Sequence, residues 1–527
     1  MPGSRYRLRL FNLKNSELRT PTIPQMIQNQ IVQPVVHAKP RMGYTATPIV
    51  VLFALGIASA WLYFWGRDLH RFTQWIAAYF GLYIVQLAIY ALACALIWNR
   101  SLKDFVRSNW ILSLCVLGFA LVFRLTLVWQ QPYLSDDVYR YVWDGRVQAA
   151  GINPYSYVPE DPQLARLRDA DIFAKIPALD RRWITPYPPA AQLAFRAVYL
   201  IRPSSVTAFK SASVFSDMLA IAALMFALKR IGDNPARAVV FAWHPLLIFE
   251  SAHSGHVESM FIAFVTIGLA AWSARAGPVK KSVVAGTAIS LATLVKFYPA
   301  LVLPAFVSGS SDSNSILERI FRTVFNRRSL ALVAGFAGAA ILFWLPYAGA
   351  GSRMFTFVSD YIVGEGFSGS GSRYFGLELL TAVAPVPAVA FLIAGALVIL
   401  WAAVHIALKT KKDVRDVASG CLALVGLYLL ITSPRYAWYY AWLLPFLCFV
   451  PSAGWLYLAS AGALLYLLWY TPLVYPNVPL WLGCGVYLPA IMLLVFERWS
   501  KMRREESPVG ESTAKERTGD QVLSSES

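Results

Sequence analysis

Two neighbouring stretches decide the fold: the apolar run WILSLCVLGFALVFRLTLVW (Trp110–Trp129) and, shortly after it, the polar stretch SDDVYRYVWDGRVQAAGINPY (Ser135–Tyr155). The first is long enough for a helix to cross the roughly 30 Å hydrocarbon core of a bilayer, which takes about 20 residues. The second opens with two adjacent carboxylates, Asp136 and Asp137, where the chain should leave the membrane. Ionisable residues are costly there, so the pair indicates a reaction site, although a polar loop after a helix would look similar.

Similar apolar runs recur along the 527 residues, of which 57% are hydrophobic and 14% aromatic, and the mean hydropathy is +0.51. Because the bilayer core offers the backbone no water, spanning segments are helices or closed barrels. Continuous apolar runs without period-two alternation exclude a barrel. We therefore predict an all-α polytopic membrane protein with about 12–14 transmembrane helices.

The formal charge of +18 does not indicate nucleic-acid binding, because much of the excess lies in short segments between apolar runs. No cleavable signal peptide is expected, because a mostly polar tail precedes the first run. Five cysteines lie inside apolar runs without metal-ligand spacing, so we expect packing residues rather than disulfides. These are Cys94, Cys115, Cys421, Cys448 and Cys484.

Basic segments fix the predicted orientation and divide the chain into parts. The basic N-terminal tail and the basic end of the last run are expected in the cytoplasm, and the polar C-terminal tail is expected to be disordered. Alternating sides place two larger loops on the outer face. The predicted parts are a tail over 1–47, a helical bundle over 48–497 with outer loops over 130–206 and 348–376, and a tail over 498–527.

Three segments depart from simple spans. In the first loop, Tyr187–Ile201 is short, follows the turn TPYPP and is predicted to lie along the membrane interface, with a true span as the alternative. Two short apolar runs meet at Leu294–Pro299, which predicts a broken hairpin with Lys296 near its outer side. The second loop is rich in glycine and serine, a composition that suits closure over a substrate or a plain linker.

The adjacent carboxylates are the first candidates for chemistry. Either Asp136 or Asp137 could take a proton from an acceptor hydroxyl arriving from outside. The alternative is a helix cap with a solvated neighbour. Asp144 lies close to Arg140 and Arg146, which suggests a local salt-bridge network.

A second candidate group lies in ESAHSGHVE (Glu250–Glu258). His253, His256 and Glu258 could contact sugar hydroxyls or bind a metal. Metal is less favoured, because the histidines are three residues apart whereas a helical metal site uses a spacing of four. Ordinary packing of a polar loop is the remaining reading.

Several cations could bind a phosphate at the outer face. Lys296 is a charge within an apolar region, where an anionic partner is expected. Three arginines could join it, namely Arg353, Arg373 and Arg435. Each alone could equally be an interfacial anchor, but their gathering on one predicted side is a stronger signal.

The order of these motifs over about residues 110–436 resembles the GT-C superfamily of membrane glycosyltransferases that use polyprenyl-phosphate sugars, most closely the mannosyltransferases. The elements that carry the resemblance are, in order, SDDVYRYVWDG, the YPP element at Tyr187–Pro189, Asp217, the turn with Gly255, His256 and Glu258, and Lys296 with Tyr298 and Pro299. The resemblance implies a GT-C-type helical bundle and an inverting transfer without a covalent intermediate, giving an α-mannoside from a β-linked donor.

The resemblance also implies roles for single residues. Asp136 matches the leading acid and would be the general base, with Asp137 as the second choice. Lys296, Arg435, Arg353 and Arg373 would bind the donor phosphate. Val138 stands where the family often has a second acid, so a metal-binding motif is in doubt and no cofactor is required. Residues expected to contact sugar or acceptor are Asp144, Tyr187, His256, Glu258 and Tyr298.

The implied partners are a polyprenyl-phosphate sugar, a glycan or glycolipid acceptor and membrane lipid, in a bacterial inner or plasma membrane. A modifier of lipid A or protein would differ only in its acceptor. A transporter or flippase of lipid-linked saccharides is the competing class, because it would also place cations beside a polar cavity. Such a protein should show related halves and charges near the midplane, and no internal repeat is apparent.

Overall fold

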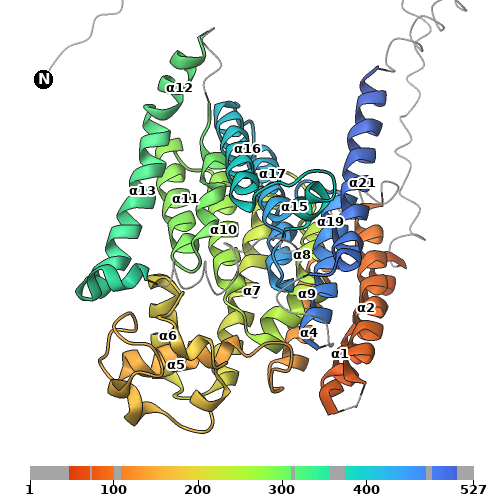
Figure 1. Ribbon diagram of the computed structural model, residues 1–527. Coiled ribbons are helices and arrows are strands. Elements are labelled where there is room, and N and C mark those ends of the chain that lie inside the picture. The colour runs from red at the N-terminus through yellow and green to blue at the C-terminus, as the bar shows by residue number, and fades with distance from the viewer. Residues whose placement is uncertain are drawn as a thin grey trace, which may run out of the picture. The chain divides into compact units, whose positions relative to one another are not determined.

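The computed structural model of the protein describes residues 47–71, 74–99, 109–309, 315–356, 374–470 and 478–506. Regular structure in these ranges is helical throughout, without a strand, and eight helices are long and apolar enough to cross a membrane (Figure 1). The predicted all-α polytopic membrane protein is confirmed. Those helices are α1 (Thr47–Gly66), α2 (Trp75–Trp98), α4 (Trp110–Leu127), α7 (Val206–Arg230), α13 (Arg327–Trp344, with a 3-10 extension), α16 (Ala388–Leu408), α17 (Val414–Thr432) and α21 (Leu480–Glu506).

Three other apolar runs, over about 236–250, 437–451 and 454–471, are predicted from the sequence as single spans, but they are chains of short helical pieces. Proline starts or interrupts several pieces, because it lacks the N–H that continues a helix; Pro235 opens η6 and Pro245 opens α9. The pieces are η6 (Pro235–Ala238), α8 (Val239–Ala242), α9 (Pro245–Ile248) and η7 (Phe249–Ser254); η10 (Ala437–Leu443) and α18 (Leu444–Leu447); and α19 (Ala453–Ala461), η11 (Gly462–Tyr466) and α20 (Leu467–Tyr470).

The predicted broken hairpin is present. α10 (Glu258–Ser273) is followed by α11 (Pro278–Thr293), which ends shortly before η8 (Tyr298–Phe306). α11 and α13 pack so closely that a Cβ on Gly286 would collide with the backbone carbonyl of Leu332. Small residues at such crossings let membrane helices approach each other.

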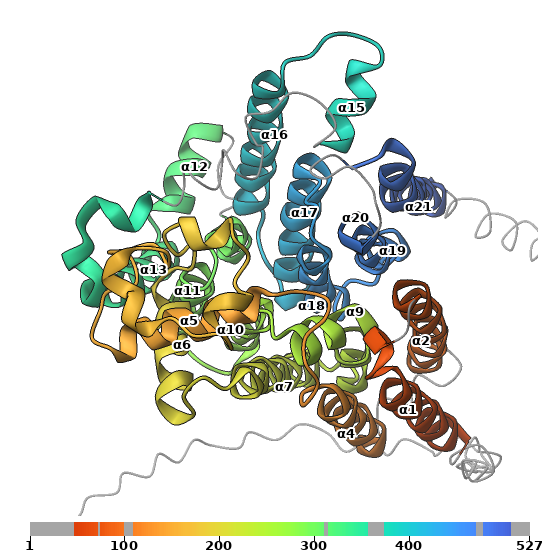
Figure 2. The same cartoon turned by 60° about the horizontal axis from the view of Figure 1, so that its bottom comes forward.

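The first loop forms a layer of short helices at one end of the bundle. Figures 1 and 2 show α5 and α6 beside the ends of α7, α10 and α11, whereas α12 lies at the opposite end. The helix predicted within Tyr187–Ile201 is confirmed, and its place relative to lipid stays a prediction. The elements are α5 (Asp137–Ala149), η3 (Pro162–Leu167), η4 (Phe173–Lys175), η5 (Asp180–Arg182) and α6 (Pro189–Ile201).

The remaining elements connect the spans. All five cysteines are free, as expected from their positions in apolar runs. Residues 498–506 of the predicted disordered C-terminal tail are helical, because α21 continues to Glu506, so that part of the prediction is wrong. The rest of both predicted tails, over 1–46 and 507–527, lies outside the described residues, as do residues 357–373 of the second loop, including Arg373. The connecting elements are η1 (Leu69–Arg71), α12 (Ile316–Val324), η9 (Leu345–Phe355) and α15 (Phe375–Thr381).

Candidate active site

The adjacent carboxylates lie where α5 begins. Asp136 holds the N-cap position, but its side chain makes no capping hydrogen bond and is exposed, while Asp137 is the acid of the first turn. A carboxylate in this place is stabilised by the positive end of the helix dipole. Partial burial raises the pKa of Asp136, and the charge of Asp137 raises it further, while Lys175 lowers it. Asp136 is therefore a stronger base than an ordinary aspartate.

Asp137 points into a group of polar side chains. Its Oδ2 accepts hydrogen bonds from the Tyr141 hydroxyl at 3.4 Å and the Tyr187 hydroxyl at 3.5 Å, and it lies 4.0 Å from His256 Nε2. Tyr187 directly precedes the two prolines that open α6. The structure thus brings Asp137, Tyr187 and His256 together from three separate segments.

A tight turn between η7 and α10 presents His256. Gly255 has a φ of +76°, a left-handed conformation that suits glycine. His256 Nε2 lies 2.8 Å from Ser135 Oγ, and Nδ1 lies 2.9 Å from Glu250 Oε2. Burial lowers the pKa of His256, but the hydrogen bond and charge of Glu250 outweigh it, so the net shift is upward. His256 therefore joins the start of α5 to the turn.

Lys296 lies in the break between α11 and η8. Its Nζ contacts Glu258 Oε1, and the Tyr298 hydroxyl donates to the same oxygen at 3.4 Å. The ammonium also lies 5.2 Å from the ring centroid of Tyr439, within cation–π range. The break in the hairpin therefore places a cation beside the first residue of α10, two positions after His256.

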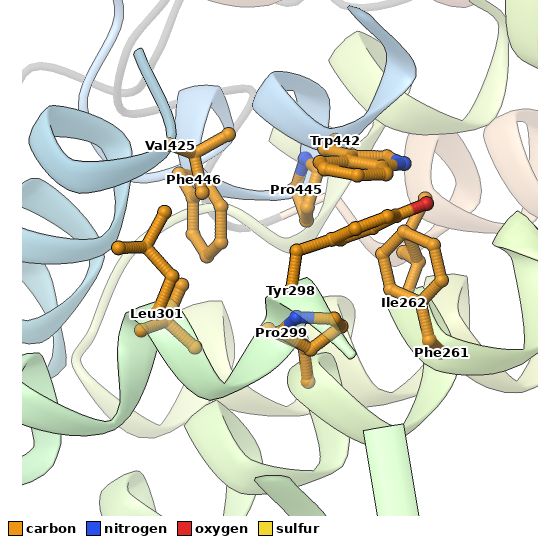
Figure 3. Close-up of a pocket in the computed structure, with 11 residues that line it drawn as sticks. Phe261, Ile262, Tyr298, Pro299, Leu301, Val425, Trp442, Pro445 and Phe446 are labelled. Carbon is orange, nitrogen blue, oxygen red and sulfur yellow. The ribbon is translucent and has the colours of Figure 1, made fainter. Parts of the chain in front are cut away.

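An apolar pocket adjoins this ion pair. Tyr298 forms part of its wall, with its ring centroid 3.6 Å from that of Trp442 (Figure 3). Phe261 and Ile262 come from α10, and Val425 comes from α17. The hydroxyl of Tyr298 reaches Glu258 while its ring faces the pocket, so one residue links the charged and apolar sides.

Asp144 is separate from the carboxylate pair. It is 2% exposed; Oδ1 accepts from Arg140 at 2.9 Å, and Oδ2 accepts from Thr185 and Gln192. The predicted pairing with Arg140 is confirmed. The predicted pairing with Arg146 is wrong, because Arg146 pairs with Asp169 at 2.6 Å. Asp144 thus holds the first loop together instead of presenting a free carboxylate.

The other predicted residues are Arg435, Arg353 and Asp217, and each makes contacts of its own. Arg435 is buried, and the ring of its neighbour Tyr436 stacks on Trp438, which packs against His256 at 4.2 Å between centroids. Arg353 donates to the Ser156 carbonyl at 3.3 Å, so it ties the second loop to the first. Buried Asp217 pairs with Arg124 at 2.8 Å inside the bundle.

Several site residues were not predicted from the sequence. Tyr141 lies one helical turn after Asp137, a spacing that could have indicated the contact. Glu250 begins the polar turn ESAHSGHVE, and its partner Tyr466, 216 residues further along the chain, donates a hydrogen bond to Oε1 at 2.6 Å. No local pattern in the sequence could have found that pairing.

No group of three or more His, Cys, Asp and Glu residues suited to a metal ion occurs among the residues that the structure describes. His253 is buried, with its ring centroid 4.0 Å from that of Tyr133. His253 therefore packs behind the turn, while His256 faces the carboxylate pair.

The bundle and its site define a class: a polytopic helical membrane protein in which a carboxylate pair at a helix end meets a histidine, and a lysine–glutamate ion pair lies beside an apolar pocket. The sequence profile described as "Alpha-(1->6)-mannopyranosyltransferase, N-terminal domain" matches residues 41–310, which is 270 of 527 residues. The chain belongs to this family. The predicted resemblance to mannosyltransferases of the GT-C type is thereby confirmed.

One similar protein is the "Alpha-(1->6)-mannopyranosyltransferase A" of Corynebacterium glutamicum, which is 26% identical over 187 residues. The match spans 34% of this chain and 36% of that relative, about a third of its length. No solved structure matches the chain significantly.

Proposed function

We propose that this protein is a mannosyltransferase that moves mannose from a polyprenyl-phosphate donor to a glycan or glycolipid acceptor. One observation carries the proposal: the start of α5 lies against the turn holding His256, with Glu258 and Lys296 directly beyond. All of these residues fall within the 41–310 range matched by the family. Membership of a mannosyltransferase family also disfavours the transporter.

Asp136 is the proposed general base. It is exposed at the N-cap of α5 and has a raised pKa, so an incoming hydroxyl can reach it and lose a proton to it. Asp137 Oδ2 already accepts hydrogen bonds from two tyrosine hydroxyls. Asp137 therefore serves better to orient the site through Tyr187 and His256.

The proposed reaction is a single inverting displacement. The acceptor oxygen bonds to the anomeric carbon of mannose, the bond from that carbon to the phosphate oxygen breaks with its electron pair, and the acceptor proton passes to Asp136. The departing phosphate requires a cation. Lys296 is the first candidate, because it lies in the break between α11 and η8 beside the apolar pocket. Arg435, Arg353 and Arg373 are further candidates.

The apolar pocket suits the lipid part of the donor. Its walls are aromatic and aliphatic, and Lys296 lies beside its Tyr298 wall. A phosphate at Lys296 could thus continue into an apolar chain in the pocket. His256, Glu258, Tyr187 and Tyr298 remain the proposed sugar and acceptor contacts, whereas Asp144 would support them through the first loop.

A donor-specificity assay tests this function. Membranes expressing the protein should transfer radiolabelled mannose from polyprenyl-phosphate mannose and not from a nucleotide-linked mannose, since only the lipid donor engages the pocket. An α-(1→6)-mannoside is the expected product, given the family description. Transfer from the nucleotide donor alone, or transport of intact lipid-linked saccharide without transfer, would contradict the proposal.

A further inference from the structure

Lys296 already has an anionic partner. Its ammonium contacts Glu258 Oε1, and that oxygen also receives the Tyr298 hydroxyl. The Lys296 side chain is 14% exposed, whereas that of Glu258 is 2% exposed. An incoming anion can therefore reach the cation, but it must compete there with a carboxylate held in the protein interior.

Three carboxylates, those of Glu250, Asp137 and Glu258, act on His256. Glu250 and Asp137 both lie close to His256, which is two residues before Glu258. Within the described residues, the second oxygen of Glu258, Oε2, is buried and accepts no hydrogen bond. A buried carboxylate oxygen without a donor is unfavourable, so this oxygen gains from any ligand hydroxyl that donates to it.

We propose that Glu258 is an exchangeable counter-ion for Lys296, occupying the ammonium when no donor is bound and yielding it to the donor phosphate. This inference rests on the proposed function. The phosphate takes the place of Oε1 on Lys296, and the released carboxylate accepts a sugar hydroxyl through its otherwise unpaired oxygen. Glu258 thereby lowers the affinity of Lys296 for lipid phosphates, and this lower affinity allows the phosphate product to leave.

The exchange matters most after the transfer. A polyprenyl phosphate leaving group is a phosphate monoester and carries more negative charge than the diester donor, since its second pKa is near 6. It would therefore bind Lys296 more strongly than the donor does. Return of Glu258 to Lys296 displaces this product and permits the next turnover.

Binding of polyprenyl phosphate, without sugar, to purified protein in detergent tests the exchange. Glu258→Gln keeps the size of the side chain but removes the competing charge, so we expect it to bind polyprenyl phosphate on the order of tenfold more tightly than the unaltered protein. The same variant should show a lower KM for donor and a lower kcat, with stronger product inhibition. Lys296→Met should abolish the gain when combined with Glu258→Gln.

The outcomes separate this inference from the proposed function. If Glu258→Gln binds polyprenyl phosphate equally or more weakly, the exchange is overturned, whether or not the unaltered protein transfers mannose. The exchange is also overturned if neither protein binds polyprenyl phosphate. Tighter binding by Glu258→Gln, together with no mannosyl transfer by the unaltered protein, supports the exchange and overturns the proposed function. A purely structural role for Glu258 would raise KM instead of lowering it.

Discussion

At the scale of single residues, the two adjacent aspartates have different surroundings. Asp137 contacts Tyr141, Tyr187 and His256, while Asp136 is more open to solvent, and its partial burial and the charge of Asp137 raise its pKa. Lys175, on η4, opposes that rise and also lies 5.0 Å from the ring of Tyr139. The environment of Asp136 is therefore open to a direct electrostatic test.

Replacing Lys175 should shift the pH dependence of transfer. A general base acts when deprotonated, so kcat/KM falls as pH falls through its pKa. Lys175→Met removes a charge that lowers the pKa of Asp136, so that pKa rises and the acidic limb moves to higher pH. Lys175→Arg, which keeps the charge, should leave the limb in place. An unmoved limb in Lys175→Met would show that Asp136 is not the base.

At the scale of elements, α7 holds together the two segments that form the site. Lys210 on α7 donates hydrogen bonds to the carbonyls of Leu127 and Gln130, which precede the carboxylate pair in the chain. One turn further along α7, Ser213 donates to the carbonyls of Gly255 and His256. The start of α5 and the turn before α10 are thus positioned by the same helix.

The turn at Gly255 should tolerate substitution poorly. A side chain at positive φ costs roughly 1–2 kcal/mol, and a Cβ on Gly255 would lie 2.8 Å from Lys210 Cγ. Gly151 is a matched control, because its φ is +78° but nothing lies within 4 Å of its added Cβ. We expect Gly255→Ala to lower both the melting temperature in detergent and the transfer rate more than Gly151→Ala does. Equal losses would mean that crowding against α7 is unimportant.

Sequence patterns predicted the continuous spans better than the broken ones. α4 and α16 follow from apolar length alone, but residues 236–250 and 437–451, which are also largely apolar, form short pieces around prolines. The candidate site was also predicted only in part. His256, Glu258 and Lys296 stand out as polar residues in apolar surroundings, whereas the contact of Tyr466 with Glu250 depends on tertiary packing.

At the scale of the whole molecule, the ends of the bundle differ. α5 and α6 lie at one end, and α12 lies at the other (Figure 1). Basic residues near α12 and after α16 are expected in the cytoplasm, since positively charged loops stay inside. The carboxylate pair should then lie on the outer face.

Cysteine labelling in intact cells tests this orientation. Asp171 is exposed in the first loop, and Lys409 is exposed after α16. A membrane-impermeant maleimide should label Asp171→Cys but label Lys409→Cys only after the cells are opened. The unsubstituted protein, with its five free cysteines, supplies the background. The reverse pattern would place the site in the cytoplasm and contradict an acceptor on the outer face.

Transfer of mannose by variants of the carboxylate pair tests the central claim most directly. Membranes carrying the double variant Asp136→Asn and Asp137→Asn would be compared with the unaltered protein, using radiolabelled polyprenyl-phosphate mannose and equal amounts of folded protein. Loss of the general base should reduce transfer by about 10²–10⁴-fold, and Asp136→Asn alone should account for most of it. Full transferase activity in the double variant would contradict the account.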